Sequence, residues 1–282
     1  PIWSPGFLPK VFQPTSIDGR NNTPISNLAR AKQMTPQQQR AQLDILKTLN
    51  AKHQQLRPHE ADLAARLESF ELAYRMQGCA PEAVDTSAES DATKKLYGLD
   101  SSNASTAAYG RQCLVARRLV ERGVRFVELT MVGTDGMGQA ANPWDQHTKL
   151  EEGHTANAMT VDQPVAGLVK DLKSRGLLDE TLVIFSGEFG RTPFVQGTNG
   201  RDHNPYGYSV WLAGGGAKGG TVYGATDELG YHATENKCDV YDLWATVLHL
   251  LGVDHEELTY RHGGRDLRLT DVHGNVIKEV LA

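Results

Sequence analysis

Apolar residues recur at helical spacing in five stretches of the chain. Thr35 and Pro36 form a helix-start signal, and Leu43, Leu46 and Leu49 follow at near-helical intervals. A glycine closes each of the last three stretches, as is common just past the end of a helix. The pattern therefore predicts helices from Thr35 onward and over about residues 58–77, 107–123, 161–175 and 239–251.

Short apolar runs rich in β-branched residues lie between these helices. Residues 124–132 read Val-Arg-Phe-Val-Glu-Leu-Thr-Met-Val, residues 181–185 read Thr-Leu-Val-Ile-Phe, and residues 208–213 read Tyr-Ser-Val-Trp-Leu-Ala. Such runs are typical of strands, and continuous apolar ones are typical of buried strands in parallel sheets. Because strands alternate with helices, the sequence predicts an α/β fold with a mostly parallel sheet between helical layers.

The same patterns suggest how the chain is organised. Residues 1–34 have no clean periodicity and are predicted to form an extended arm or loops. Residues 35–123 are predicted to be a helical segment that covers the sheet, and residues 124–282 the α/β core that carries the site. All three parts are expected to belong to one domain, which a chain of 282 residues is long enough to form.

Composition narrows the classes of function. Binding of nucleic acid needs a clustered basic surface, and the net charge of −5 gives no support to one, so no nucleic-acid partner is predicted. No apolar run approaches the roughly 20 residues of a membrane-spanning helix, so no membrane span is predicted. The three cysteines are too widely spaced for a paired-cysteine metal site. They allow one disulfide bridge or three free thiols, and so do not indicate a compartment.

Carboxylates and imidazoles gather in the loops that follow two predicted strands. Asp145 and His147 follow residues 124–132, and Glu188, Asp202 and His203 follow residues 181–185. In open α/β sheets the functional residues collect beyond the carboxyl ends of the strands. A single Asp-x-His pair is more often a turn with a surface histidine. Two such clusters favour a divalent metal site, and we expect the side chains to converge within about 8 Å.

Two arginines flank the same loops. Arg191 and Arg201 suit an anionic substrate, because a guanidinium binds phosphate or sulfate oxygens in a bidentate fork. The alternative is structural pairing with neighbouring carboxylates, and the sequence leaves both open. His154 is likewise either a further ligand or a solvent-facing residue.

Several motifs resemble those of one large, uncharacterised bacterial family that is described as sulfatase-like. They are Trp144-Asp-Gln-His147, Gly187-Glu-Phe-Gly-Arg-Thr-Pro193, Gly200-Arg-Asp-His203 and Leu212-Ala-Gly-Gly-Gly216. That family is placed in the alkaline-phosphatase-like superfamily. The resemblance implies hydrolysis of a sulfate or phosphate ester of a small molecule or glycan, with one or two zinc, manganese or calcium ions.

The resemblance also implies roles for individual residues. Asp145 and His147 match a first ligand pair, Glu188 a second acidic ligand, and His203 with Asp202 a later ligand. Glu188 stands where an aspartate is usual, which departs from the superfamily's pattern.

Relatives carry a further motif upstream that holds the first aspartate ligand and the nucleophile, and nothing in residues 1–34 resembles it. The expectation is therefore a fold that is incomplete at the N-terminus, with the nucleophile outside this chain. Export signals in relatives imply a periplasmic or other extracytoplasmic location. A non-catalytic metal- or glycan-binding scaffold of the same fold is the alternative function.

Overall fold

The computed structural model describes residues 4–9, 12–18, 25–26, 28–57, 61–131, 133–134, 140–141 and 144–282. The chain divides into two compact units. One unit comprises Pro1–Asp85 with His262–Arg265, and the other comprises Thr86–Arg261 with Asp266–Ala282. Among the described residues, no helix is both long enough and apolar enough to cross a bilayer.

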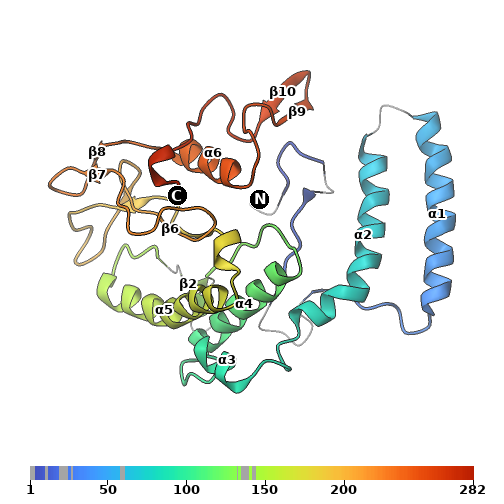
Figure 1. The fold of residues 1–282 in the computed structure, drawn as a ribbon, viewed down its shortest axis with the longest axis horizontal. Coiled ribbons are helices and arrows are strands. Elements are labelled where there is room, and N and C mark those ends of the chain that lie inside the picture. The colour runs from blue at the N-terminus through green and yellow to red at the C-terminus, as the bar shows by residue number, and fades with distance from the viewer. Residues whose placement is uncertain are drawn as a thin grey trace. The chain divides into compact units, whose positions relative to one another are not determined.

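Figure 1 shows the elements in chain order, coloured from blue to red. The helices are α1 (Pro36–Leu56), α2 (Ala61–Val84), α3 (Asp91–Leu96), α4 (Ala104–Glu121), α5 (Leu150–Ser174) and α6 (Val240–Leu250), with short 3-10 helices η2 (Leu178–Glu180) and η3 (Lys278–Val280). The strands are β1 (Gly133–Thr134), β2 (Ala140–Ala141), β3 (Val183–Phe185), β4 (Gly190–Arg191), β5 (His203–Asn204), β6 (Trp211–Ala213), β7 (Ala225–Thr226), β8 (Ala233–Glu235), β9 (Thr259–His262) and β10 (Arg265–Arg268).

The first unit contains a hairpin of two long helices, α1 and α2, which lie side by side in Figure 1. A capping box starts α1: the Thr35 side chain accepts a hydrogen bond from the Gln38 backbone amide, and the Gln38 side chain accepts one from the Thr35 backbone amide. The prediction of a helix from this signal is confirmed. Arg40 of α1 donates two hydrogen bonds to Glu71 of α2, at 2.7 and 3.0 Å, and so links the two helices.

The core of the second unit lies between α4 and α5, which pack along each other (Figure 1). Its buried cluster comprises Tyr97, Tyr109, Cys113, Leu114, Val161, Leu168 and Leu172. Tyr97 caps α3 and has no exposed surface. A Cβ on Gly110 of α4 would lie 2.0 Å from the Tyr97 carbonyl oxygen, so only glycine allows this approach.

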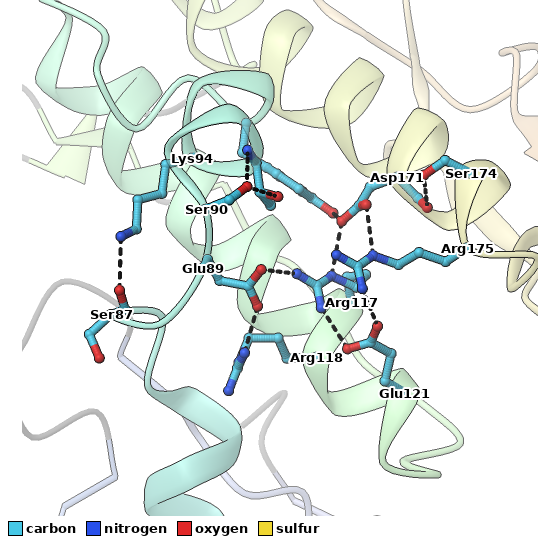
Figure 2. A network of polar contacts seen from close by, with 12 residues as sticks. Ser87, Glu89, Ser90, Lys94, Arg117, Arg118, Glu121, Asp171, Ser174 and Arg175 are labelled. Carbon is cyan, nitrogen blue, oxygen red and sulfur yellow. Dashed lines mark hydrogen bonds and ion pairs between the residues drawn. The ribbon is translucent and has the colours of Figure 1, made fainter.

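One arginine is buried in this core with three carboxylates around it (Figure 2). The Arg117 side chain is only 2% exposed, and its nitrogens lie 2.8 Å from Glu89, 2.5 Å from Glu121 and 3.0 Å from Asp171. Burial alone would lower the pKa of Arg117. The hydrogen bonds to Glu121 and Glu89 outweigh that effect and raise the pKa, so the guanidinium stays charged.

Two more arginines balance the negative charge of this network (Figure 2). Arg118 lies 2.5 Å from Glu89, and Arg175 lies 2.8 Å from Asp171. The Tyr97 hydroxyl donates a further hydrogen bond to Asp171 at 3.0 Å. The network therefore joins the start of the unit, α4 and α5 through charged groups that are all partnered.

The predicted parallel sheet is wrong. The structure is 42% helical and 11% strand, and the strands of the described residues form only short two-stranded antiparallel sheets. β3 pairs with β6 in antiparallel register, with Val183 opposite Ala213 and Phe185 opposite Trp211. A parallel pair needs a crossover, usually a helix. The chain between Phe185 and Trp211 contains the β4–β5 hairpin instead of a helix, so β6 runs antiparallel to β3.

The predicted strand at residues 124–132 is also wrong for the part that is described. Residues 124–131 form no helix or strand and join no sheet of the described residues, and Val132 lies outside those residues. Leu129 and Met131 pack against the core cluster, whereas Phe126 is 59% exposed. The β-branched, apolar composition of this run thus marks a segment that packs partly on the core but is not a paired strand.

Candidate metal centre

Two loops of the second unit bring three of the predicted ligands together. Asp145 and His147 precede α5, and His203 is the first residue of β5, opposite Arg191 of β4. The Asp145 Oδ1 atom lies 2.8 Å from His147 Nε2 and 2.9 Å from His203 Nε2. The two Nε2 atoms are 3.1 Å apart. The three residues are therefore a possible metal-binding triad.

The dimensions of this triad fit a small divalent cation. Two ligand atoms at about 2.0 Å from a tetrahedral zinc ion are separated by about 3.3 Å. The three separations in the triad, 2.8, 2.9 and 3.1 Å, are slightly shorter than that. The ligand atoms thus need to move apart only slightly to accept an ion. Ligands of two imidazoles and one carboxylate suit zinc, manganese or iron.

Gln196 orients the first imidazole. The Nδ1 atom of His147 makes a short hydrogen bond with Gln196 Oε1. An amide oxygen accepts, so Gln196 takes this hydrogen bond from Nδ1–H, and Nε2 is the ring nitrogen that faces Asp145 and His203. Metal-binding histidines are usually oriented in this way by a hydrogen bond from the other ring nitrogen. The arrangement is that of a histidine prepared for a metal.

The pKa of Asp145 is lowered to about 2, first by its hydrogen bond with His203 and then by that with Arg191. Arg191 donates this bond from Nη1 at 2.8 Å. Imidazole coordinates a metal only in its neutral form, which requires a pH far above 2. The aspartate is therefore ionised throughout the range in which the histidines can bind a metal.

Backbone groups also hold the two loops together. The Lys149 amide donates to Asn199 Oδ1 at 2.8 Å, and the Arg201 amide donates to the Gln146 carbonyl at 3.0 Å. Gly200 packs so closely that a Cβ on it would lie 1.8 Å from the His147 carbonyl oxygen. This close approach places the His147 loop beside the strand that carries His203.

The remaining predicted site residues lie around the triad. Asp202 Oδ1 is 3.9 Å from His147 Nδ1 and accepts a hydrogen bond from the His203 amide at 2.8 Å. Glu188 is exposed in the loop after β3 and is not one of the three grouped residues. Arg191 pairs with Asp145, and Arg201 donates to the Gly200 carbonyl at 2.9 Å. Ligand roles for Glu188 and Asp202 stay predictions.

Sequence reasoning missed the residues that position the ligands. Gln196 and Asn199 lie in a stretch predicted only as a loop, and Gly200 was noted only as the first residue of the Gly200-Arg-Asp-His203 motif, without a role. Neutral amides are common in turns and carry no signature of a metal site. The one signal in the sequence was that these residues come shortly before the candidate ligand His203, in the loop that leads to it.

Gln196 offers a first prediction. Replacing it with leucine removes the acceptor for His147 Nδ1, and the affinity for zinc should fall about 10- to 100-fold, as is usual when such an outer partner is lost. The Gln196→Glu variant keeps an acceptor oxygen and should retain most of the affinity. Calorimetric titration of both variants checks this. Equal affinities in the leucine and glutamate variants would show that the hydrogen bond has no orienting role.

Comparison with known proteins gives one result for the chain as a whole. Residues 2–281 match the family model described as "Protein of unknown function (DUF1501)". No curated protein and no solved structure matches the chain. The sulfatase-like family assignment suggested by the motifs is therefore corrected, because the matching family is described without any activity. The chain belongs to the DUF1501 family of proteins of unknown function.

Proposed function

We propose that this chain binds one divalent cation through Asp145, His147 and His203 and uses it to hydrolyse phosphate or sulfate esters. The observation that carries the proposal is the triangle of one carboxylate oxygen and two Nε2 atoms, each within 3.1 Å of the others. Bound there, a divalent cation would polarise the ester and make a water more acidic.

The exposure of the triad favours a reactive site over a structural one. The side chains of Asp145, His147 and His203 are 30%, 37% and 44% exposed. Structural zinc sites are typically closed by four protein ligands, whereas catalytic sites use three and keep a position open. Within the described residues, the group has three members. A substrate or water can therefore approach the ion from solvent.

An anionic substrate is favoured by the charge beside the triad. Arg191 is 17% exposed and donates to the same Asp145 oxygen that faces both histidines. One arginine and one divalent cation together carry more positive charge than Asp145 removes. The ring of Phe189 packs on His203, with centroids 4.2 Å apart, and shields one side of the site from water. A net positive, partly shielded site favours a phosphate or sulfate group.

The choice of metal follows from the ligand types. Calcium prefers an all-oxygen shell, so zinc or manganese fits two imidazoles better. Two histidines and a carboxylate are also the ligand set of mononuclear iron(II) centres, so iron(II) belongs in any metal panel.

The proposal is tested with metal-free protein that is reloaded with zinc, manganese, calcium or iron(II). Turnover of 4-nitrophenyl phosphate and 4-nitrophenyl sulfate is expected with zinc or manganese, and it should fall at least about 100-fold in Asp145→Asn. Asp179→Asn, an exposed aspartate outside the site, is the matched control. Metal binding without turnover of any ester would favour a non-catalytic scaffold instead.

A further inference from the structure

An apolar groove lies between one face of α5 and the β3–β6 pair. Its volume is about 700 Å³, within the range of small-molecule sites. Aromatic and aliphatic side chains line most of it, including Trp144, Met159, Val165, Phe185 and Trp211. Its charged lining residues, Asp162 and Lys170, are exposed and lie on α5, eight positions or about 12 Å apart along the helix.

The wall opposite α5 is built from stacked aromatic rings. Phe185 and Trp211 are cross-strand partners in the β3–β6 pair, and their rings are nearly parallel, with an interplanar angle of 6° and centroids 5.7 Å apart. Trp211 is 40% exposed and Met159, across the groove, is 57% exposed. A flat apolar surface of this kind remains in contact with solvent unless something covers it. A flat aromatic group is the complementary shape.

The groove and the metal centre share one segment of the chain. Trp144 lines the groove and is bonded directly to Asp145, whose carboxylate faces both histidines. The Trp144 ring is held edge-on against His154, with centroids 5.4 Å apart. One peptide bond thus separates a wall residue of the groove from a proposed metal ligand, so a ligand bound at the triad has the groove within reach on the Trp144 side.

We infer that this groove binds the aryl group of an aromatic phosphate or sulfate ester whose anionic end lies at the triad. The inference rests on the proposed function for the anionic end only. The groove itself has few polar groups to recognise a sugar, whereas it presents three aromatic rings to a flat apolar group. Aryl esters are therefore the substrate class that the groove and the triad fit together.

Binding of two non-hydrolysable probes to the zinc-loaded protein tests the inference. Naphthyl phosphonate carries an aryl group and methylphosphonate does not. In Trp211→Ala, the Kd for naphthyl phosphonate should rise about tenfold, and that for methylphosphonate should stay unchanged. Trp244→Ala is the matched control, because Trp244 is 39% exposed and does not line the groove. Equal changes for both probes, or none for either, would overturn the inference.

A second pair of variants guards against misfolding of Trp211→Ala. Ala166→Glu places a charge in the groove at an exposed position of α5. Ala156→Glu is its control, because it places a charge at an exposed position of the same helix that does not line the groove. Only Ala166→Glu should weaken naphthyl phosphonate binding.

The outcomes separate the two proposals. Failure of ester turnover, with the selective binding of the aryl probe intact, would remove the hydrolase proposal and leave the groove assignment standing. Ester turnover without selective binding of the aryl probe would overturn the groove assignment and leave the hydrolase proposal standing. A protein dimer that Ala166→Glu dissociates would assign the groove to self-association and overturn the inference.

Discussion

The Gly200→Ala variant is expected to lose zinc binding, with an affinity at least about 100-fold lower than that of the wild type. A Cβ at this position would lie 1.8 Å from the His147 carbonyl oxygen and 2.1 Å from its carbon. Both are backbone atoms, so no side-chain rotation relieves the clash. The His147 loop must move away from the strand that carries His203, and the three ligand atoms then separate.

Gly187→Ala is the matched control for this prediction. Gly187 lies in the loop after β3, and its added Cβ would meet nothing closer than 3.6 Å. Calorimetric zinc titration and circular dichroism of both variants separate a local effect from unfolding. The helical signal of Gly200→Ala should match that of the wild type, because the clash lies outside α4 and α5. Unaltered zinc affinity in Gly200→Ala would mean that the close contact does not hold the site together.

Replacing Arg117 with methionine should destabilise the second unit by about 3–5 kcal/mol, the usual cost of removing one partner from a buried ion pair. The side chain is 2% exposed, and its loss leaves the carboxylates of Glu89, Glu121 and Asp171 without the central cation (Figure 2). The melting temperature should fall by roughly 10 °C, given 2–4 °C for each kcal/mol in a unit of this size.

Thermal unfolding of three variants checks the role of this arginine. Arg111→Met, at an exposed position of the same helix, should change the melting temperature little. Arg117→Lys keeps the charge but lacks the planar fork that reaches several carboxylates, so an intermediate loss is expected. A melting temperature for Arg117→Met equal to that of Arg111→Met would show that the network contributes nothing to stability.

Helix ends with strong local signals could be predicted from the sequence. Thr35 before α1 and Asp239 before α6 both accept hydrogen bonds from the first turn of their helices. The start of α5 could not be predicted in this way. Its residues 150–160 are largely polar, so no apolar stripe marks them, and its N-cap residue Lys149 makes no side-chain cap. The backbone of Lys149 is held instead by Asn199, fifty residues away.

The prediction of a parallel sheet was wrong because strand pairing depends on residues that are distant in the chain. Residues 124–131 have the composition of a strand, and β3 and β6 lie where apolar runs predicted them. Whether two strands pair, and in which direction, depends on the connection between them. The hairpin between β3 and β6 reads in sequence as a loop with candidate ligands, and it gives no sign of an antiparallel return.

The candidate site was predicted better than the sheet around it. Asp145, His147 and His203 stand out because carboxylates and imidazoles recur together after two successive apolar runs, and the structure brings these three side chains together. Gln196 and Gly200 act through one hydrogen bond and one close contact, which no local pattern encodes. The extracytoplasmic location and the ester substrate stay predictions, since the matching family is described without a function.

Zinc titration of the wild type and of His203→Ala tests the triad most directly. The account predicts one zinc ion per chain in the wild type, and an affinity at least about 100-fold lower in His203→Ala. His249→Ala, which removes an exposed histidine of α6, should bind zinc like the wild type. If His203→Ala binds one zinc ion as tightly as the wild type does, then Asp145, His147 and His203 are not a metal centre.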